Sequence, residues 1–238
     1  IGALWVMATN PAVSLPEAAT VRAALRRVPC LVVSDCTRES DTLALARIRL
    51  PALGWGEKDG TVTNSERVIS RQRGFRPWPG EARPDWWMVA QVAARLGWAA
   101  QFAWDGPAAI FREHAAVTTL ARPAPRAFDL TGLTGLSDAA YASLAPIRWP
   151  VLRPGVPGGR LAPPARFIAT PYRPPAAAPD AAYPLRLLTG RLRDQWHTMT
   201  RTGLVPRLMA HAPEPVLAIH PADTCLLYTS PSPRDRTR

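Results

Sequence analysis

Polar side chains suited to a large anionic ligand gather at three places in this sequence. The first follows two short apolar runs, where Asn10 and the pair Ser34 and Asp35 stand. The second is a glycine-rich stretch that carries Lys58, and the third is TGRLRDQWHTMTRTG, residues 189–203. Phosphate groups are bound by Arg, Lys, Thr hydroxyls and backbone N–H groups, whereas the edge of a base needs Asp or Asn. Together the three places predict a cradle for a ligand of the dinucleotide type.

Other kinds of catalytic site lack their usual residues. The sequence has no G-x-S-x-G motif, and none of its four histidines has the spacing of a metal ligand. Cys30, Cys36 and Cys225 form no C-x-x-C pair, which argues against a disulfide framework and against zinc or iron–sulfur ligation. G-x-G-x-x-G and Walker A motifs are also absent, so simple NAD and ATP sites are poorly supported.

The charge of the chain does not indicate a nucleic-acid partner. The formal net charge is +11, but the basic residues are scattered, and Lys58 is the only lysine among them. Such an arginine excess is typical of a chain encoded by GC-rich DNA. No apolar run approaches the roughly 18 residues of a membrane span, so no membrane association is predicted either. An ordinary reduced, cytoplasmic context fits the cysteine usage best.

The first polar group is placed by a predicted strand–helix–strand unit. Residues 3–8 and 30–35 are short apolar runs typical of strands, and a helix is expected between them, up to about Arg27. Ser14 to Glu17 has the spacing of a capping box for that helix. The two strands are then parallel neighbours, and Asn10, Ser34 and Asp35 fall at their carboxyl ends, where ligands bind open α/β sheets. Plain turn and capping chemistry is the alternative for these residues.

The second group lies in a glycine-rich loop. A short helix near 40–46 precedes it, and residues 61–73 alternate as the strands of a β-ribbon would. Gly54, Gly56 and Gly60 would let backbone N–H groups approach a phosphate or a flat ring, with Lys58 and Arg67 as counter-charges. A glycine-rich hairpin without a ligand remains equally compatible with this pattern.

The remaining sequence predicts a helical stretch, a connector and a second domain. Helices are expected at 84–96, 107–117 and 137–144. The buried side of the first of these is expected to consist of Trp86, Trp87, Val89, Val92 and Leu96. Residues 121–182 are otherwise rich in Pro, Ala, Gly and Arg and have little core-forming power, which marks a boundary. Two predicted strands, at 185–190 and 215–223, then indicate a β-rich domain from about residue 183.

Both ends of the chain are expected to be artificial. Ile1 already stands in a predicted strand, so we expect an internal piece of a longer protein. Residues 225–238, CLLYTSPSPRDRTR, lack hydrophobic periodicity, and their back-translation resembles a transposase-type sequencing adapter read through in frame. A natural Ser/Pro/Arg tail is the alternative.

Six collinear motifs resemble one enzyme family. They are ATNP, VVSD, GWGEKDGTVTNSER, GEARPDWW, TGRLRDQWHTMTRTG and EPVLAIHPAD, and they extend across most of residues 1–223. Together they are similar to the molybdenum oxidoreductases that bind bis(molybdopterin guanine dinucleotide), or bis-MGD. The RDQWHTMTRTG and FRPWPGEARPDWW blocks most resemble the assimilatory nitrate reductase branch.

The resemblance implies an α/β fold in two domains. Residues 1–118 would be the later part of a Rossmann-like parallel-sheet domain, and residues 119–182 would be a Pro/Ala-rich connector. Residues 183–224 would begin a C-terminal β-barrel of the double-psi type that closes over the cofactor. Residues 225–238 belong to neither domain.

The same resemblance assigns cofactor contacts to residues of all three places. Asn10, Ser34 and Asp35 would face the cofactor from the strand ends. Lys58 would approach its pyrophosphate or pterin, and Asp85 would bind a guanine-type edge. The turn would wrap the pterin through Thr189, Gly190, Arg191, Gln195, Trp196, His197 and Thr198.

The resemblance further implies reduction of nitrate to nitrite, with electrons from a donor protein or subunit passing through an iron–sulfur cluster. The family's cluster cysteines and its molybdenum-ligating cysteine have no counterpart in this sequence, and Cys30 and Cys36 match neither motif. We therefore expect no catalytic residue, no metal ligand and no nitrate reduction by this chain alone. Two alternatives stay open: another bis-MGD oxidoreductase such as a formate dehydrogenase, and a non-catalytic scaffold subunit of the same fold.

Overall fold

The computed structural model divides the chain into two compact units, Ile1–Ala182 and Tyr183–Arg238. The residues that it describes are 1–118, 120, 128–154, 167–221 and 223. The tail 225–238, expected to be translated adapter, and Cys225 lie outside the described residues.

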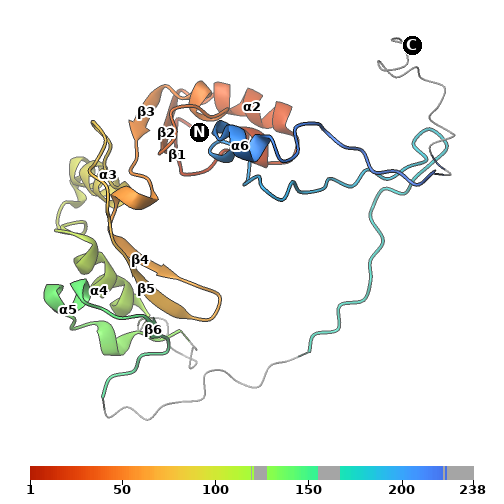
Figure 1. Ribbon diagram of the computed structural model, residues 1–238. Coiled ribbons are helices and arrows are strands. Elements are labelled where there is room, and N and C mark those ends of the chain that lie inside the picture. The colour runs from red at the N-terminus through yellow and green to blue at the C-terminus, as the bar shows by residue number, and fades with distance from the viewer. Residues whose placement is uncertain (119, 121–127, 155–166, 222, 224–238) are drawn as a thin grey trace. The chain divides into compact units, whose positions relative to one another are not determined.

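A parallel sheet of three strands opens the first unit (Figure 1). Its strands, in the order in which they pair, are β1 (Ala3–Met7), β2 (Cys30–Asp35) and β3 (Ile48–Pro51). β1 and β2 run parallel, with Val6 opposite Val33, so the predicted strand–helix–strand unit is confirmed. β3 was not predicted because its arginines interrupt the apolar run, yet it pairs in parallel with β2.

Two helices, α1 (Pro11–Ser14) and α2 (Ala18–Arg26), connect β1 to β2 in place of the single predicted helix. The predicted capping box is wrong, since the Ser14 hydroxyl donates to the backbone oxygen of Asn10 at 3.0 Å. The helix breaks because a residue before proline avoids the helical region, and Leu15 is extended with a ψ of 149°.

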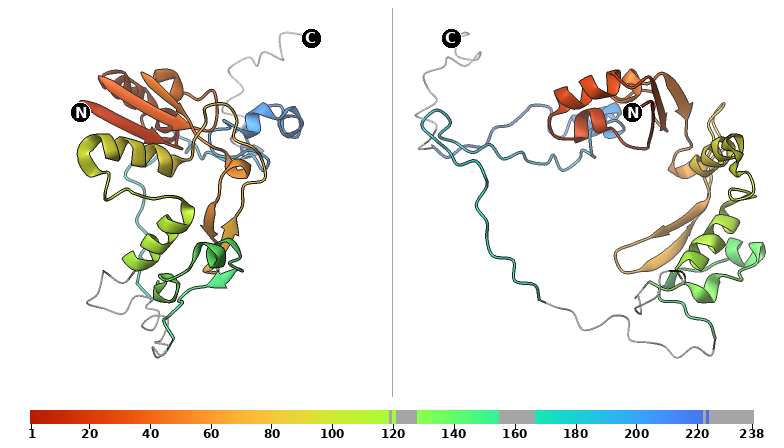
Figure 2. Two further views of the ribbon diagram at one scale, coloured as in Figure 1. Left: turned by 90° about the vertical axis from the view of Figure 1, so that its left-hand side faces the viewer. Right: turned by 180° about the vertical axis from the view of Figure 1, so that it is seen from behind.

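The first core lies between α2 and the parallel sheet (Figure 2). Leu25 of α2 packs in this core, and the short turn η1 (Leu43–Leu45) adds Leu43 where a helix at 40–46 was expected. The buried members of this core are Val6, Ala12, Leu25, Leu31, Val33 and Leu43. The burial of these side chains fixes the carboxyl ends of β1 and β2, from which the first polar group projects.

The predicted β-ribbon forms a second, antiparallel sheet. After the turn η2 (Trp55–Glu57), β4 (Gly60–Thr63) pairs with β5 (Val68–Gln72), so the ribbon is confirmed. A short strand, β6 (Ile147–Arg148), adds to the other edge of β5, with Ile69 opposite Ile147. A later part of the chain therefore completes the sheet.

A second core forms beside this sheet. The helices α4 (Pro107–Val117) and α5 (Asp138–Ala142) confirm two predictions, and the turn η4 (Thr131–Leu133) lies between them in sequence. The core contains Ile69, Phe111, Ala115, Leu130, Leu133 and Tyr141. Little core-forming power was expected of residues 121–182, which is wrong for the part from 128 to 151 because Leu130 and Tyr141 are almost fully buried.

The helix expected at 84–96 is present as α3 (Asp85–Ala93), continued by the π-helical turn η3 (Ala94–Trp98). Its expected buried side is wrong, because Trp87, Val92 and Leu96 are 38%, 41% and 63% exposed. Trp86 and Val89 are only half-buried. The buried residues are Met88, Ala90 and Ala93. Ala90 and Ala93, three residues apart, lie on the inner face of the helix. The size and apolar character of a side chain were therefore not enough to predict its burial.

Among its described residues, the second unit has two short helical segments, η5 (Thr202–Leu204) and α6 (Pro206–Met209). The strands predicted at 185–190 and 215–223 are wrong, since no strand occurs among the described residues from 183 onward. Leu187, Leu188 and Val216 are 79%, 81% and 86% exposed. A strand needs a neighbour for its backbone groups, and these two segments do not pair with each other. The described residues therefore form no double-psi barrel.

Candidate functional site

Asn10 is buried and linked to the loop before η1. Its Oδ1 accepts hydrogen bonds from the Thr42 backbone N–H at 3.0 Å and from the Thr42 hydroxyl at 2.7 Å. Its Nδ2 donates to Asp41 at 3.4 Å, and the Thr42 oxygen also accepts from the backbone N–H of Ala12 at 3.1 Å. The Asn10 side chain thus joins the segments after β1 and β2, which limits what its carbonyl oxygen can offer a ligand.

Ser34 and Asp35 lie at the carboxyl end of β2, and Met7 of β1 stands opposite Ser34. The two strand ends are therefore adjacent. Ser34 is fully buried, and its hydroxyl accepts from the Trp5 indole N–H at 3.1 Å. Asp35 is half-buried, and its Oδ1 accepts from the Thr37 backbone N–H at 3.2 Å. Of this pair, Asp35 is the more accessible to a ligand.

Lys58 and Asp85 form an ion pair across the glycine-rich loop. Lys58 Nζ lies 2.9 Å from Asp85 Oδ2, and the two side chains remain 33% and 30% exposed. Lys58 follows η2, whereas Asp85 opens α3. An ion pair this exposed stabilises the fold by at most about 1 kcal/mol, so the Lys58 ammonium can exchange Asp85 for an anionic ligand at little cost.

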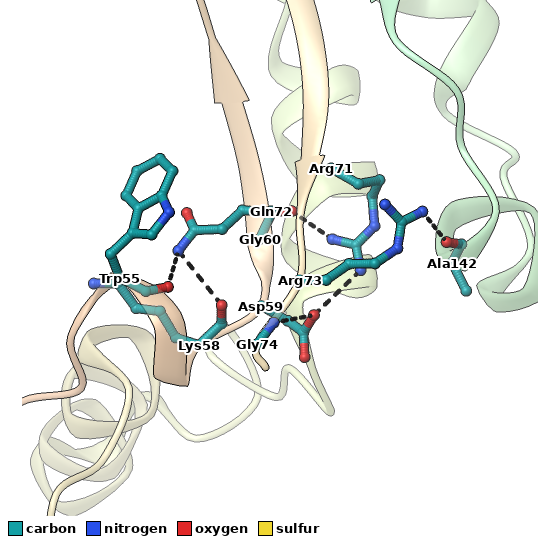
Figure 3. A network of polar contacts seen from close by, with 9 residues as sticks. All are labelled: Trp55, Lys58, Asp59, Gly60, Arg71, Gln72, Arg73, Gly74 and Ala142. Atoms are coloured by element: carbon teal, nitrogen blue, oxygen red, sulfur yellow. Dashed lines mark hydrogen bonds and ion pairs between the residues drawn. The ribbon is translucent and has the colours of Figure 1, made fainter. Parts of the chain in front are cut away.

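The backbone around Lys58 is held by β5 and the residues that follow it (Figure 3). Gln72 Nε2 donates to the backbone oxygens of Trp55 and Lys58, at 2.7 Å and 3.4 Å. Asp59 accepts from the Gly74 backbone N–H at 3.3 Å. A Cβ atom added at Gly56 would stand 2.7 Å from the ring of Phe75, which is 77% exposed and would have to turn aside.

Arg71 also holds the loop, through contacts with the residues that follow Lys58. Its side chain is 7% exposed, and it pairs with Asp59 at 3.6 Å and donates to the backbone oxygen of Gly60. The Arg71 guanidinium also lies over the ring of Tyr141, 4.0 Å from the ring centre. Burial raises the pKa of the Tyr141 hydroxyl, and the nearby Arg71 charge opposes part of that rise. The loop is therefore tied to α5.

The polar turn of the second unit surrounds a hollow of about 530 Å³. Five of the residues predicted from the resemblance line it: Gly190, Arg191, Gln195, Trp196 and His197. The other two, Thr189 and Thr198, do not line it. Thr189 is exposed and Thr198 is half-buried.

Aromatic contacts order the wall of this hollow. The Arg191 guanidinium lies 5.9 Å from the centre of the Trp196 indole, which meets the His197 ring edge-on at 4.8 Å. Gln195 Nε2 donates to the sulfur of Met209 at 3.2 Å, and Gln195 Oε1 is buried without a hydrogen-bond partner in the described part of the chain. The hollow thus presents a cation and an imidazole, and the unpartnered Gln195 oxygen is buried in its wall.

A neighbouring charge cluster was not predicted. Asp194 accepts hydrogen bonds from Arg193 at 3.0 Å and from His211 Nδ1 at 3.0 Å, beside a second hollow of about 280 Å³. The Arg193 hydrogen bond, followed by that from His211, holds the pKa of the Asp194 carboxyl below its ordinary value. Asp194 was visible in the motif, but His211 lies outside it and offered no signal.

Metal ligands and membrane spans are both missing from what the structure describes. Among the described residues, no three His, Cys, Asp or Glu side chains gather closely enough to hold a metal ion. Within the same ranges, every helix is too short or too polar to cross a bilayer.

Two family models match the chain. The molybdopterin oxidoreductase model matches residues 1–95, and the molybdopterin dinucleotide-binding domain model matches residues 185–226. In both stretches the chain is similar to molybdopterin enzymes. All three groups of candidate residues fall within the matched ranges, since Asn10 to Asp85 lie in the first and Thr189 to Thr198 lie in the second.

Several relatives are similar to this chain along almost its whole length. A nitrate reductase of Klebsiella oxytoca is 52% identical over 94% of this chain and 26% of its own length. A nitrate reductase of Shewanella frigidimarina is 46% identical over 92% of this chain and 25% of its own. An F420-dependent formate dehydrogenase subunit alpha of Methanocaldococcus jannaschii is 33% identical over 92% of this chain and 32% of its own length. The chain thus spans about a quarter to a third of these relatives.

Proposed function

We propose that this chain is part of a molybdenum-dependent nitrate reductase, which reduces nitrate to nitrite for assimilation, and that it helps to bind bis-MGD. The observation that carries the proposal is the likeness to two nitrate reductases along nearly the whole chain, at identities well above that of the formate dehydrogenase subunit. The two matched family models support the choice of cofactor.

The chemistry of the candidate residues fits such a cofactor. A pyrophosphate is an anion that favours charge-assisted hydrogen bonds, and Lys58 and Arg191 offer such donors. A pterin carries ring N–H and amino groups, and the Gln195 side chain, whose Oε1 is buried without a partner among the described residues, would supply an acceptor on turning toward the hollow. Trp196 and His197 offer flat surfaces beside it.

The chain's own residues would bind and orient the cofactor. Lys58 would hold negative charge on the phosphates, and Asp85, its partner in the structure, would accept hydrogen bonds from a guanine edge. The cofactor would also be contacted at the carboxyl ends of β1 and β2, by Asn10, Ser34 and Asp35. In the turn, Thr189, Gly190 and Thr198 would surround the ligand together with the residues of the hollow. When bound, the cofactor supplies the two-electron chemistry that converts nitrate to nitrite.

The partners and the domain organisation belong to the same proposal. Electrons would come from a donor protein or subunit, through an iron–sulfur cluster held by residues outside this sequence, and the enzyme would work in the cytoplasm. Residues 1–118 would form the later part of the Rossmann-like domain, residues 119–182 the connector, and residues 183–224 the start of the barrel. Neither nucleic acid nor membrane is a proposed partner.

The decisive experiment uses the complete gene product that contains this sequence. The purified enzyme should oxidise reduced viologen with nitrate and should not oxidise formate. Formate oxidation without nitrate reduction would instead favour a formate dehydrogenase, like the 33% identical relative of Methanocaldococcus jannaschii. Absence of molybdenum and of both activities would overturn the proposal.

A further inference from the structure

Lys58 is held through both its side-chain ammonium and its backbone carbonyl. Its ammonium is paired with Asp85 at 2.9 Å, and its backbone oxygen accepts from Gln72 Nε2 at 3.4 Å. The same amide nitrogen of Gln72 donates to the backbone oxygen of Trp55 at 2.7 Å. One side chain on β5 therefore satisfies two carbonyl groups of the loop, three residues apart (Figure 3).

The neighbouring groups of the loop have partners of their own. The Gly56 oxygen accepts from the backbone N–H groups of Phe75 and Arg76, at 2.8 Å and 2.9 Å. Glu57 accepts from the Gly54 backbone N–H at 2.8 Å. Residues 71–76 thus hold the backbone of the loop through hydrogen bonds. Among them, Gln72 is the residue that binds the carbonyl groups of Trp55 and Lys58.

We infer that Gln72 is a positioning residue for Lys58. By fixing the carbonyls of Trp55 and Lys58, the Gln72 amide keeps the Lys58 stem directed at Asp85. Gln72 has no ligand contact of its own in this role. The inference rests on the proposed function only in that Lys58 is taken as a contact of an anionic cofactor.

The composition of the chain makes this inference measurable. Lys58 is the only lysine, so an amine-reactive ester modifies one side chain and the N-terminal amine. The rate of modification at Lys58, followed by mass spectrometry on the full chain, reports how often its ammonium leaves Asp85. Loss of the ion pair in Asp85→Asn sets the upper limit of this rate.

We expect Gln72→Met to raise the Lys58 modification rate about two- to five-fold, the range that a partly exposed ion pair supports. The matched control is Gln101→Met, at an exposed glutamine in the turn after η3, which should leave the rate unchanged. Thermal unfolding of each variant establishes that it is folded at the labelling temperature. If Gln72→Met does not fold, Gln72→Asn, which keeps the amide but shortens the side chain, should shift the rate in the same direction.

The double variant Gln72→Met/Asp85→Asn distinguishes a specific effect on the Lys58–Asp85 pair from a general loosening of the loop. If Gln72 acts through the Lys58–Asp85 pair, Gln72→Met should add little to the modification rate of Asp85→Asn. Multiplied effects in the double variant, or an unchanged rate in Gln72→Met alone, would overturn the inference.

Guanosine diphosphate provides the separate test of the site. Protection of Lys58 by this nucleotide in the unmodified sequence, weakened in Gln72→Met, supports both the positioning role and the proposed cofactor contact. An accelerated Gln72→Met without any protection by the nucleotide leaves the positioning role standing and counts against Lys58 as a cofactor contact.

Discussion

Asn10 and Thr42 are joined by two hydrogen bonds that converge on one oxygen atom. The Thr42 N–H and hydroxyl both donate to Asn10 Oδ1, at 3.0 Å and 2.7 Å, and both residues are buried. The segment after β1 is thereby fixed to the segment after β2. The geometry of this edge of the parallel sheet depends on the pair as much as on the strands.

Removing the Thr42 hydroxyl should destabilise the first unit. Thr42→Val keeps the size of the side chain but deletes one donor to Asn10 and the acceptor for the Ala12 N–H. We expect a loss of about 1–3 kcal/mol in the free energy of unfolding, because a buried N–H is left unpaired. Urea unfolding measures this change. Thr42→Ser, which retains the hydroxyl, should lose less, and equal losses in both variants would show that the hydroxyl is unimportant.

The buried Tyr141 should make the first unit less stable in alkali. Burial raises the pKa of its hydroxyl, so the folded state holds the proton more tightly than the unfolded state does. Stability is therefore complete below the ordinary tyrosine pKa of about 10 and falls as the pH rises through the higher value of the folded state. The melting temperature of Tyr141→Phe should decline less between pH 9 and pH 11, since phenylalanine cannot ionise. Parallel declines in the two proteins would contradict this.

Gly132 should tolerate no side chain. A Cβ atom there would lie 2.6 Å from the backbone oxygen of Leu152, whereas one at Gly135 would meet nothing within 4 Å. Gly132→Ala should therefore cost about 1–3 kcal/mol of unfolding free energy, as overpacking does. The matched control Gly135→Ala should be neutral or slightly stabilising. Differential scanning calorimetry of the two variants compares them directly, and similar melting temperatures would contradict the predicted contact.

Replacement of Arg191 or His197 by alanine should reduce cofactor occupancy in the complete gene product before it affects anything else. Loss of one charge-assisted hydrogen bond, worth about 1.5–3 kcal/mol, weakens retention at least ten-fold. Molybdenum content per protein measures the effect. Arg207→Ala, an exposed site in α6, is the control, and molybdenum contents equal to that control would remove Arg191 and His197 from the site.

The local elements were readable from the sequence where a short pattern determines them. The alternation of residues 61–73 predicted the ribbon, and the apolar run at 30–35 predicted β2, because burial of one face imposes a period. The partners of the polar residues were not readable. Asn10 meets Thr42 and Lys58 meets Asp85 across long stretches of chain, and no local pattern records such pairings. Thr42 and Gln72, which hold the candidate site in place, were missed for this reason.

The expected barrel strands failed for a different physical reason. Leu187 and Leu188 stand in a run that has the composition of a strand, yet both are largely exposed. A strand is stabilised by its neighbours, so its composition alone cannot create it. Trp87 shows the same limit on a helix, where a large apolar side chain lies on the outer face.

The pairing of β6 with β5 also has a consequence for biosynthesis. Ile69 leaves the ribosome long before its partner Ile147, and synthesis adds only about 5–20 residues per second. For several seconds the outer edge of β5 therefore stands open in the nascent chain, with the core residues Leu130 and Tyr141 still to come. During this interval the open edge of β5 can pair with a wrong strand, and a chaperone that covers strand edges would protect it.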